Sequence, residues 1–249
     1  MKVTTENETI NRLRGTIIEV LAVKHPLDCP VCDSAGACDF QDMIHKYLTW
    51  DVRIKGERSS KPADSRAPLV ERNSNRCIVC AKCVRICEEV QGVGAIGLVN
   101  RSHETEVQPA YGEPLDCEFC GQCISTCPVG ALLSKPFKYQ SRPWLMTQKS
   151  STCGYCGVGC NINLEVEKNQ VKRITSTIGK GVNQGNLCGK GRFGYQVFKH
   201  QDRLTQPLRR DAKSNELKSI SWDTAYMEAA KNFKKVVENH GADAVAALG

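Results

Sequence analysis

The sequence predicts an α+β fold that is held together more by bound metal groups than by an extensive apolar core. Three observations lead to this prediction. Apolar residues recur at helical spacing near both ends of the 249-residue chain, residues 161–175 alternate apolar and polar side chains as a β-hairpin does, and 15 cysteines accompany only 6% aromatic residues. Such a composition indicates that inorganic clusters or disulfides organise much of the fold.

The cysteine usage favours clusters over disulfides. The N-terminal segment has no apolar run that could form a signal-peptide core, and an odd number of cysteines leaves a thiol unpaired in any all-disulfide scheme. The longest apolar stretch, about IIEVLAV, is far too short to cross a membrane. We therefore expect a cytoplasmic chain with no membrane span of its own, either free or held peripherally on the cytoplasmic side of the inner membrane by a membrane-attached complex.

A formal net charge of +7 raises the question of a nucleic-acid partner. No tract of lysine and arginine interleaved with aromatic residues appears along the chain. An oxidised four-iron cluster on four thiolates carries a charge of about −2, so several such clusters would cancel the basic excess. We therefore predict no nucleic-acid partner.

Two helices are expected before residue 50. In the first, one face collects Ile10, Leu13, Ile17, Val20, Leu21 and Lys24. The sequence TENE at residues 5–8 has the form of a capping box and places the start of this helix near Thr5. In the second helix, the residues predicted to face inward are Phe40, Met43, Ile44, Tyr47 and Leu48.

The centre of the chain carries the spacing C-x2-C-x2-C-x3-C twice, in CIVCAKCVRIC (77–87) and CEFCGQCISTCP (117–128). One such loop wraps three corners of a four-iron cluster, and a remote cysteine supplies the fourth. The expected ligation is crossed: Cys77, Cys80 and Cys83 with Cys127, and Cys117, Cys120 and Cys123 with Cys87. Structural zinc prefers two C-x2-C pairs and does not use a third cysteine at this spacing. This segment resembles a bacterial two-cluster ferredoxin.

The upstream sequence HPLDCPVCDSAGACDFQD offers one histidine and three cysteines, namely His25, Cys29, Cys32 and Cys38. Taken alone, this set also suits zinc, and a lone histidine is often only a core residue. Beside a ferredoxin-like segment, an imidazole ligand has a redox purpose, because replacing a thiolate by neutral nitrogen raises the reduction potential of a cluster. We therefore predict a four-iron cluster with one histidine ligand here.

The last set lies in CGYCGVGC and NLCGKGRF and comprises Cys153, Cys156, Cys160 and Cys188, with zinc again as the alternative. The glycines let the backbone fold tightly around a cluster. With this set all 15 cysteines are assigned. A hairpin turning at residues 168–170 separates the third and fourth cysteines, and a final helix is predicted from an N-cap at Ser221 to Gly241, followed by the start of a buried strand at residues 243–249.

The order of these motifs resembles the iron–sulfur part of two related families, the large iron–sulfur subunit of NADH dehydrogenase (complex I) and the alpha subunit of NAD-linked formate dehydrogenases. In molybdopterin oxidoreductases a lysine two residues after the last cluster cysteine lies between cluster and pterin, and Lys190 matches that position. The sequence ISWDTA (220–225) resembles the opening of their pterin-binding part. Family members usually begin with a two-iron domain, whereas no cysteine precedes Cys29 here.

The resemblance implies a division into a His/Cys four-iron domain, a double four-iron ferredoxin-like domain and a molybdopterin-oxidoreductase-type four-iron domain with a truncated start of the pterin-binding region. The expected ranges of these domains and of the two linkers between them are 1–55, 56–75 (linker), 76–135, 136–150 (linker) and 151–249. Molybdopterin itself is expected only if a longer chain or a partner completes the last domain.

The predicted function is single-electron transfer through four four-iron clusters within an NADH dehydrogenase-like or formate dehydrogenase complex. No catalytic residue is assigned, because no complete substrate site is found in the sequence. The partners implied are a flavin- and NADH-binding subunit and further redox subunits. The alternatives are a truncated formate dehydrogenase alpha chain and a zinc-stabilised scaffold.

Overall fold

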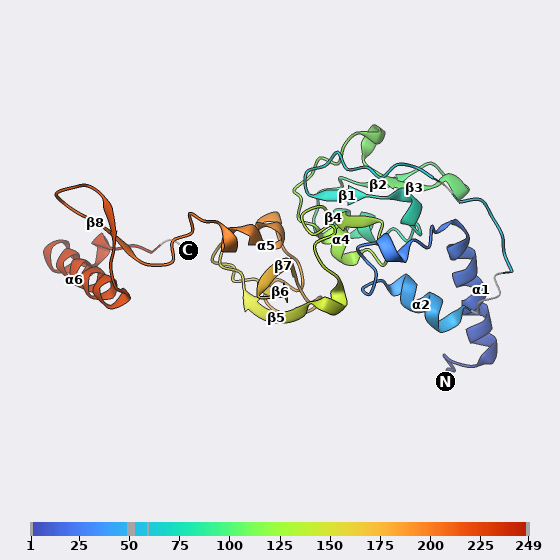
Figure 1. Ribbon diagram of the computed structural model, residues 1–249, viewed down its shortest axis with the longest axis horizontal. Helices are drawn as coiled ribbons and strands as arrows, with labels where there is room; N and C mark the ends of the chain where they lie inside the picture. Colours follow the sequence, from blue (N-terminus) through green and yellow to red (C-terminus); the bar gives the residue numbers. More distant parts are fainter. Residues whose placement is uncertain (1, 49–52, 59, 248–249) are drawn as a thin grey trace. The chain divides into compact units, whose positions relative to one another are not determined.

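The computed structural model describes residues 2–48, 53–58 and 60–247, which form two compact units, Met1–Tyr195 and Gln196–Gly249 (Figure 1). The α-helices are α1 Glu8–Lys24, α2 Asp39–Tyr47, α3 Lys82–Arg85, α4 Gln122–Thr126, α5 Gly189–Phe193 and α6 Trp222–His240. The strands are β1 Val70–Arg72, β2 Gly97–Val99, β3 Glu106–Gln108, β4 Leu132–Ser134, β5 Thr147–Thr152, β6 Asn161–Glu167, β7 Gln170–Thr175, β8 Leu208–Arg210 and β9 Leu217–Ser219. All strand pairs are antiparallel, so the predicted mixture of helix and sheet is confirmed.

Helix α1 starts three residues later than predicted. Its N-cap is Asn7, whose side-chain oxygen accepts a 2.8 Å hydrogen bond from the backbone N–H of Ile10, so the capping box at Thr5 is wrong. The predicted apolar face is also wrong, because Leu13, Ile17 and Val20 are all more than half exposed.

The face of α1 that is buried carries Gly15, Ile18, Glu19 and Ala22. This face is buried because Gly15 lets α1 come close to α2. A Cβ added at Gly15 would lie only 2.8 Å from the carbonyl oxygen of Tyr47 on α2. The buried carboxylate of Glu19 is satisfied by backbone and guanidinium N–H groups of Arg53. Close approach of the two helices and the ion pair of the buried Glu19 with the exposed Arg53 therefore override the apolar pattern.

Helix α2 largely follows the prediction. Phe40 is 3% exposed, and Ile44, Tyr47 and Leu48 pack against the same core cluster as Ile18 and Ala22 of α1. Met43 was predicted to face inward and is 46% exposed, because it lies at the edge of this face.

The central segment contains two small sheets, β1 paired with β4 and β2 paired with β3. Val70 lies opposite Ser134, and Leu98 lies opposite Val107. Their core includes Val70, Cys83, Ile96, Val107 and Leu132. Ordered structure thus begins inside the interval 56–75 that was predicted to be a linker, since β1 falls there and Asp64 forms a bridge with Arg72.

Strands β5, β6 and β7 form a three-stranded sheet. The predicted hairpin is confirmed, and its turn residues Lys168 and Asn169 have φ of 49° and 59°, which suits a tight two-residue turn. Strand β5 was not predicted, because every residue of TQKSST is exposed and the stretch has no apolar alternation. The core of this part is Ile162, Ile174, Leu187 and Tyr195.

The second unit contains β8, β9 and α6. The predicted final helix is confirmed, with Ser221 as N-cap, whose hydroxyl accepts a 3.2 Å hydrogen bond from Thr224 N, and Gly241 as C-cap. The predicted strand over residues 243–249 is wrong for the described residues, because Ala242–Ala244 forms a 3-10 turn and residues 245–247 are irregular; residues 248–249 lie outside the described part. Among the described residues no helix is long and apolar enough to cross a membrane.

Candidate metal centres

The two cysteine loops of the central segment follow the same backbone path. In the first loop Val79 and Ala81 have φ of 56° and 59°, and in the second Phe119 and Gly121 have φ of 46° and 71°. In each loop the second of these residues is the N-cap of a short helix, α3 or α4. The repeat seen in the sequence is therefore repeated in three dimensions, including a left-handed conformation that non-glycine residues rarely adopt.

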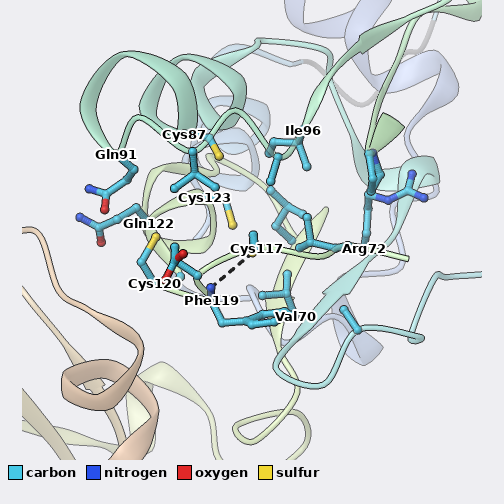
Figure 2. A pocket seen from close by; sticks show the side chains of 18 of the residues that line it. Val70, Arg72, Cys87, Gln91, Ile96, Cys117, Phe119, Cys120, Gln122 and Cys123 are labelled. Carbon is cyan, nitrogen blue, oxygen red and sulfur yellow. Dashed lines mark hydrogen bonds between the residues drawn. The ribbon is translucent and has the colours of Figure 1, made fainter. Parts of the chain in front are cut away.

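Eight cysteines of this segment line two apolar cavities in a crossed arrangement. One cavity is lined by Cys77, Cys80, Cys83 and Cys127, together with apolar residues that include Val129 and Leu132. The other is lined by Cys87, Cys117, Cys120 and Cys123 (Figure 2). Each loop thus shares its cavity with the last cysteine of the other loop, which is the grouping that the predicted crossed ligation requires.

The raised pKa values of these thiols favour the binding of a positively charged metal group. Burial, with the charges of Cys127, Cys77 and Cys80 adding to it, raises the pKa of Cys83 to about 12. Burial also raises the pKa of Cys123 and of Cys127. Thiols in such surroundings stay protonated on their own, and they become thiolates only when a cation compensates their charge.

The first sulfur of each loop accepts a hydrogen bond from the backbone. Val79 N donates to Cys77 Sγ and Phe119 N donates to Cys117 Sγ, both at 3.3 Å. These two bonds occupy equivalent positions in the two loops. Hydrogen bonds to ligand sulfur stabilise the reduced, more negative state of an iron–sulfur cluster.

The upstream set is built at the end of α1 and the start of α2. His25 is the C-cap of α1, Cys29 opens a 3-10 turn (Cys29–Val31), and Cys38 is the N-cap of α2, where its sulfur accepts a 3.4 Å hydrogen bond from Gln41 N. Burial raises the pKa of Cys38, and the charges of Cys32 and Cys29 raise it further, so the three thiols influence one another.

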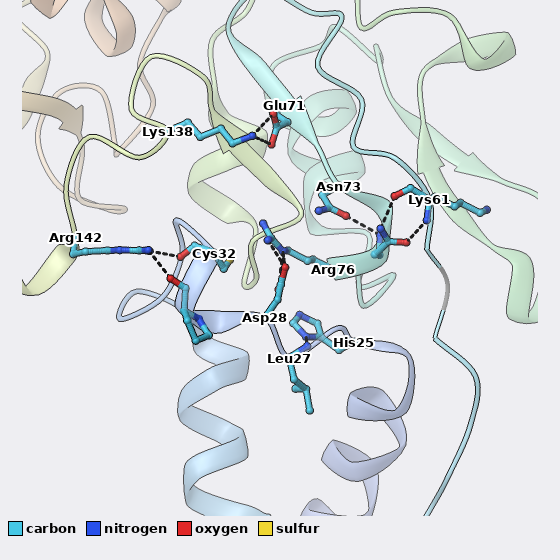
Figure 3. Close-up of polar contacts among 12 residues, drawn as sticks. His25, Leu27, Asp28, Cys32, Lys61, Glu71, Asn73, Arg76, Lys138 and Arg142 are labelled. Carbon is cyan, nitrogen blue, oxygen red and sulfur yellow. Dashed lines mark hydrogen bonds and ion pairs between the residues drawn. The ribbon is translucent and has the colours of Figure 1, made fainter.

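The His25 side chain fits a metal ligand. It is 8% exposed and lies beside Phe40, with ring centroids 5.1 Å apart. Its Nδ1 accepts a 3.3 Å hydrogen bond from Leu27 N, and its Nε2 is buried with no hydrogen-bond partner among the described residues (Figure 3). Burial lowers the pKa of His25 and so favours the neutral ring that binds metals.

The long contact from Leu27 bears on how His25 would bind. A lone pair on Nε2 places the ring proton on Nδ1, and a protonated Nδ1 cannot accept from Leu27 N. Coordination through Nε2 would therefore exchange this 3.3 Å hydrogen bond for a metal bond.

Arg76 and Gly130 join the upstream set to the central segment. Arg76 is 7% exposed, directly precedes Cys77 and pairs with Asp28, which directly precedes Cys29 (Figure 3). A Cβ added at Gly130 would lie 2.3 Å from Cys32 Sγ, so only glycine allows this approach. The sequence analysis missed both residues; the one available signal was that Arg76 directly precedes Cys77.

The fourth set lies around the β5–β6 connection and the start of α5. The backbone N–H of Cys153 donates to the carbonyl of Cys160 at 2.8 Å, and Cys188 is the N-cap of α5 with Gly191 N 3.5 Å from its sulfur. Burial and then the charges of Cys153, Cys156 and Cys188 raise the pKa of Cys160, which indicates that the four thiols gather in one place. Cys156, Cys188 and Lys190 are all exposed.

No group of three or more His, Cys, Asp or Glu side chains within residues 2–48, 53–58 and 60–247 has the arrangement of a site for a single metal ion.

The chain matches four family models of oxidoreductases, three of which describe iron–sulfur regions. Residues 14–51 match the NADH-ubiquinone oxidoreductase-G iron-sulfur binding region, and residues 67–133 match the ferredoxin-like domain of NADH-quinone oxidoreductase subunit 3. Residues 146–200 match the molybdopterin oxidoreductase Fe4S4 domain, and residues 203–249 match molybdopterin oxidoreductase.

Individual relatives identify the family more closely. The chain is 42% identical over all of its 249 residues to the NADPH-Fe(3+) oxidoreductase subunit alpha of Geobacter sulfurreducens. It is 33% identical over 95% of its length to the NADH-ubiquinone oxidoreductase 75 kDa subunit of Reclinomonas americana. It spans 29% and 34% of those two proteins. The predicted resemblance is therefore confirmed: the chain belongs to the family of the large, 75 kDa iron–sulfur subunit of NADH-quinone oxidoreductase and matches it over the iron–sulfur part.

Similarity is also found among solved structures. A crystal structure of an NAD+-reducing [NiFe]-hydrogenase in the H2-reduced state matches with a TM-score of 0.50 and 26% identity, covering 55% of this chain and 59% of that one. The similarity thus extends from sequence to fold.

Proposed function

We propose that this chain carries four four-iron clusters and passes single electrons between a flavin-containing, NAD(P)H-oxidising partner and a second redox site. The observation that carries the proposal is the crossed grouping of eight cysteines around two apolar cavities. A single zinc site has no use for two such interleaved sets.

The proposed ligands form four sets. His25, with its unpartnered buried Nε2, joins Cys29, Cys32 and Cys38 in the first. The remaining sets are Cys77, Cys80, Cys83 and Cys127; Cys117, Cys120, Cys123 and Cys87; and Cys153, Cys156, Cys160 and Cys188. Mutual effects on the thiol pKa values of Cys38, Cys83 and Cys160, each from cysteines of the same set, support this division.

We propose three domains around these sets, as the sequence analysis expects. Support comes from the family matches, whose ranges 14–51, 67–133 and 146–200 each contain the cysteines of one domain. We propose that the central domain starts at about residue 64, earlier than the expected residue 76; the bridge between Asp64 and Arg72 and the position of β1 support this start.

A bound four-iron cluster supplies one-electron redox chemistry, whereas nicotinamide exchanges a hydride, so a flavin on a partner must divide the electron pair. The residues of this chain would hold the clusters and keep water away from them. Val70, Ile96 and Leu132 exclude water from the cavities, and the amides of Val79 and Phe119 favour the reduced state. Lys190 remains the proposed contact to a pterin if a longer chain or a partner supplies one.

A partner surface is proposed on α1. Leu13, Ile17 and Val20 form an exposed apolar stripe at helical spacing, with exposed fractions of 56%, 60% and 53%. A contiguous apolar stripe of this kind is typical of protein interfaces.

The test is anaerobic reconstitution followed by metal and sulfide analysis. Four clusters predict about 16 iron and about 16 sulfide per chain. The loaded chain should accept electrons from dithionite and should reduce a dye with NADH only after a flavoprotein partner is added. Several zinc atoms with negligible sulfide would favour the scaffold alternative. The formate dehydrogenase alternative stays a prediction. The match of residues 203–249 to molybdopterin oxidoreductase suits an NADH dehydrogenase-type subunit and a formate dehydrogenase alpha chain equally.

A further inference from the structure

Arg192 is a buried cation that lies against the second cysteine loop. It is 5% exposed, sits in α5 four residues after Cys188, and donates from Nε to the carbonyl oxygen of Cys120 at 2.8 Å. Its Nη2 donates to the side-chain oxygen of Gln122, which is 2% exposed. Figure 2 shows Gln122 and Cys120 side by side at the wall of the cavity lined by Cys87, Cys117, Cys120 and Cys123.

The charge of Arg192 has no carboxylate partner in the described part of the chain. The nearby Glu165, which lines the same cavity as Arg192, is paired with Arg173 at 2.6 Å. Burial lowers the pKa of Arg192, and the charges that act in the opposite direction come from Cys120 and Cys123. The comparable buried Arg76 differs, because Asp28 compensates it.

A buried, unpaired guanidinium is costly unless another charge compensates it. A four-iron cluster on four thiolates carries a net negative charge that grows by one on reduction. The negative charge nearest to Arg192 would therefore be that of the second loop's own cluster, and it would be larger in the reduced state.

We propose that Arg192, reaching from the fourth cysteine set, raises the reduction potential of the cluster held by Cys117, Cys120, Cys123 and Cys87 and so favours its reduction beside the fourth cluster. Arg192 is a positioning residue, since it contacts the loop and not the cluster atoms. The inference rests on the proposed four-cluster function.

Three variants of the full, anaerobically reconstituted chain test the proposal by EPR-monitored redox titration, with the relevant signal assigned by its change in Cys120→Ser. Arg192→Gln removes the charge, and we expect the reduced-to-oxidised ratio at a fixed potential to fall about tenfold, which is 59 mV for one electron. At an effective dielectric of about 20, a unit charge about 12 Å from the cluster gives a shift of that size, and a closer charge gives a larger one. Arg192→Lys keeps the charge and should keep most of the potential.

Gln122→Glu is the third variant, and it tests the same charge effect if Arg192→Gln does not fold. It keeps the shape and the oxygen that accepts from Arg192, and loses only the hydrogen bond that Gln122 Nε2 donates to Asn186 Oδ1. Because it places a carboxylate against Arg192, it should lower the same potential as Arg192→Gln does. The matched control is Arg142→Gln, which removes an arginine that donates to the carbonyl of Cys32 (Figure 3) but lies only half-buried, and it should leave the Cys120 signal unchanged.

The outcomes separate the two proposals. Wild-type protein without iron and sulfide would overturn the proposed function itself. Intact clusters with unchanged potentials in Arg192→Gln and Gln122→Glu would overturn only the role of Arg192. An equal fall in Arg192→Lys and Arg192→Gln would also overturn it, because packing and not charge would then be responsible.

Discussion

Replacing Gly130 by alanine tests the contact between the first and second cysteine sets. A Cβ at this position would lie 2.3 Å from Cys32 Sγ, which is about 1.1 Å short of the 3.4 Å where ordinary van der Waals contact begins. It would also lie 3.4 Å from Arg76 Cδ, so the sulfur cannot be relieved simply by moving the backbone toward the arginine. Overpacking of this kind typically costs about 1–3 kcal/mol in the free energy of unfolding.

The size of the penalty depends on whether Cys32 is bound. In the metal-free chain the thiol can rotate about its Cα–Cβ bond and relieve part of the overlap, whereas a sulfur bonded to iron cannot. We therefore expect Gly130→Ala to lose about one cluster of iron on reconstitution and to lower the thermal stability of the loaded chain more than that of the metal-free chain.

Gly97→Ala is the matched control, since its Cβ would meet nothing within 4 Å. Thermal unfolding and iron content of both variants, with and without metal, make the comparison. If Gly130→Ala matched Gly97→Ala in iron content and in stability, the close packing of Cys32 against residue 130 would be refuted.

Three further predictions concern ligands, metal and pH. His25→Cys should keep the iron content and lower the potential of one cluster by EPR titration, whereas His25→Ala should lose that cluster alone; unchanged spectra in both would contradict ligation by His25. Removing iron with a chelator should abolish the cooperative thermal transition of residues 77–130, and its survival would contradict a metal-organised core. Hydrogen bonds from Arg66 hold the pKa of Asp64 well below its usual range, so the stability that Asp64 contributes is present above its ordinary pKa of about 3.9 and is lost as the pH falls toward the folded-state value. Acid unfolding curves should therefore be shallower in Asp64→Asn, and parallel curves would rule this out.

The grouping of the eight central cysteines around two cavities could be predicted because the repeated spacing along the chain sets the path of each loop. Three cysteines with two residues between each pair can face a common centre only if the loop curls around it, and both loops do so with matching left-handed residues. Local signals were equally dependable at Ser221, where a side chain caps a helix, and at the turn of Lys168 and Asn169.

The features that sequence analysis missed depend on contacts between distant segments. The buried side of α1 is decided by Gly15 against Tyr47 and by Glu19 with Arg53, and neither partner can be inferred from helical spacing. Strand β5 has no apolar pattern and exists because β6 pairs with it. Arg192 follows the fourth set in sequence, yet its partners belong to the second loop, 72 residues earlier for Cys120.

The two copies of the repeated loop differ at one position that gives them separate neighbours. Gly121 leaves room for Arg192, because a Cβ there would lie 2.3 Å from the arginine Cδ, whereas the equivalent residue of the first copy is Ala81 and carries that Cβ. An arginine seated in the same way therefore does not fit on the first loop. A single methyl group, that of Ala81, therefore distinguishes two otherwise matching loops and decides which of them the arginine of α5 can contact.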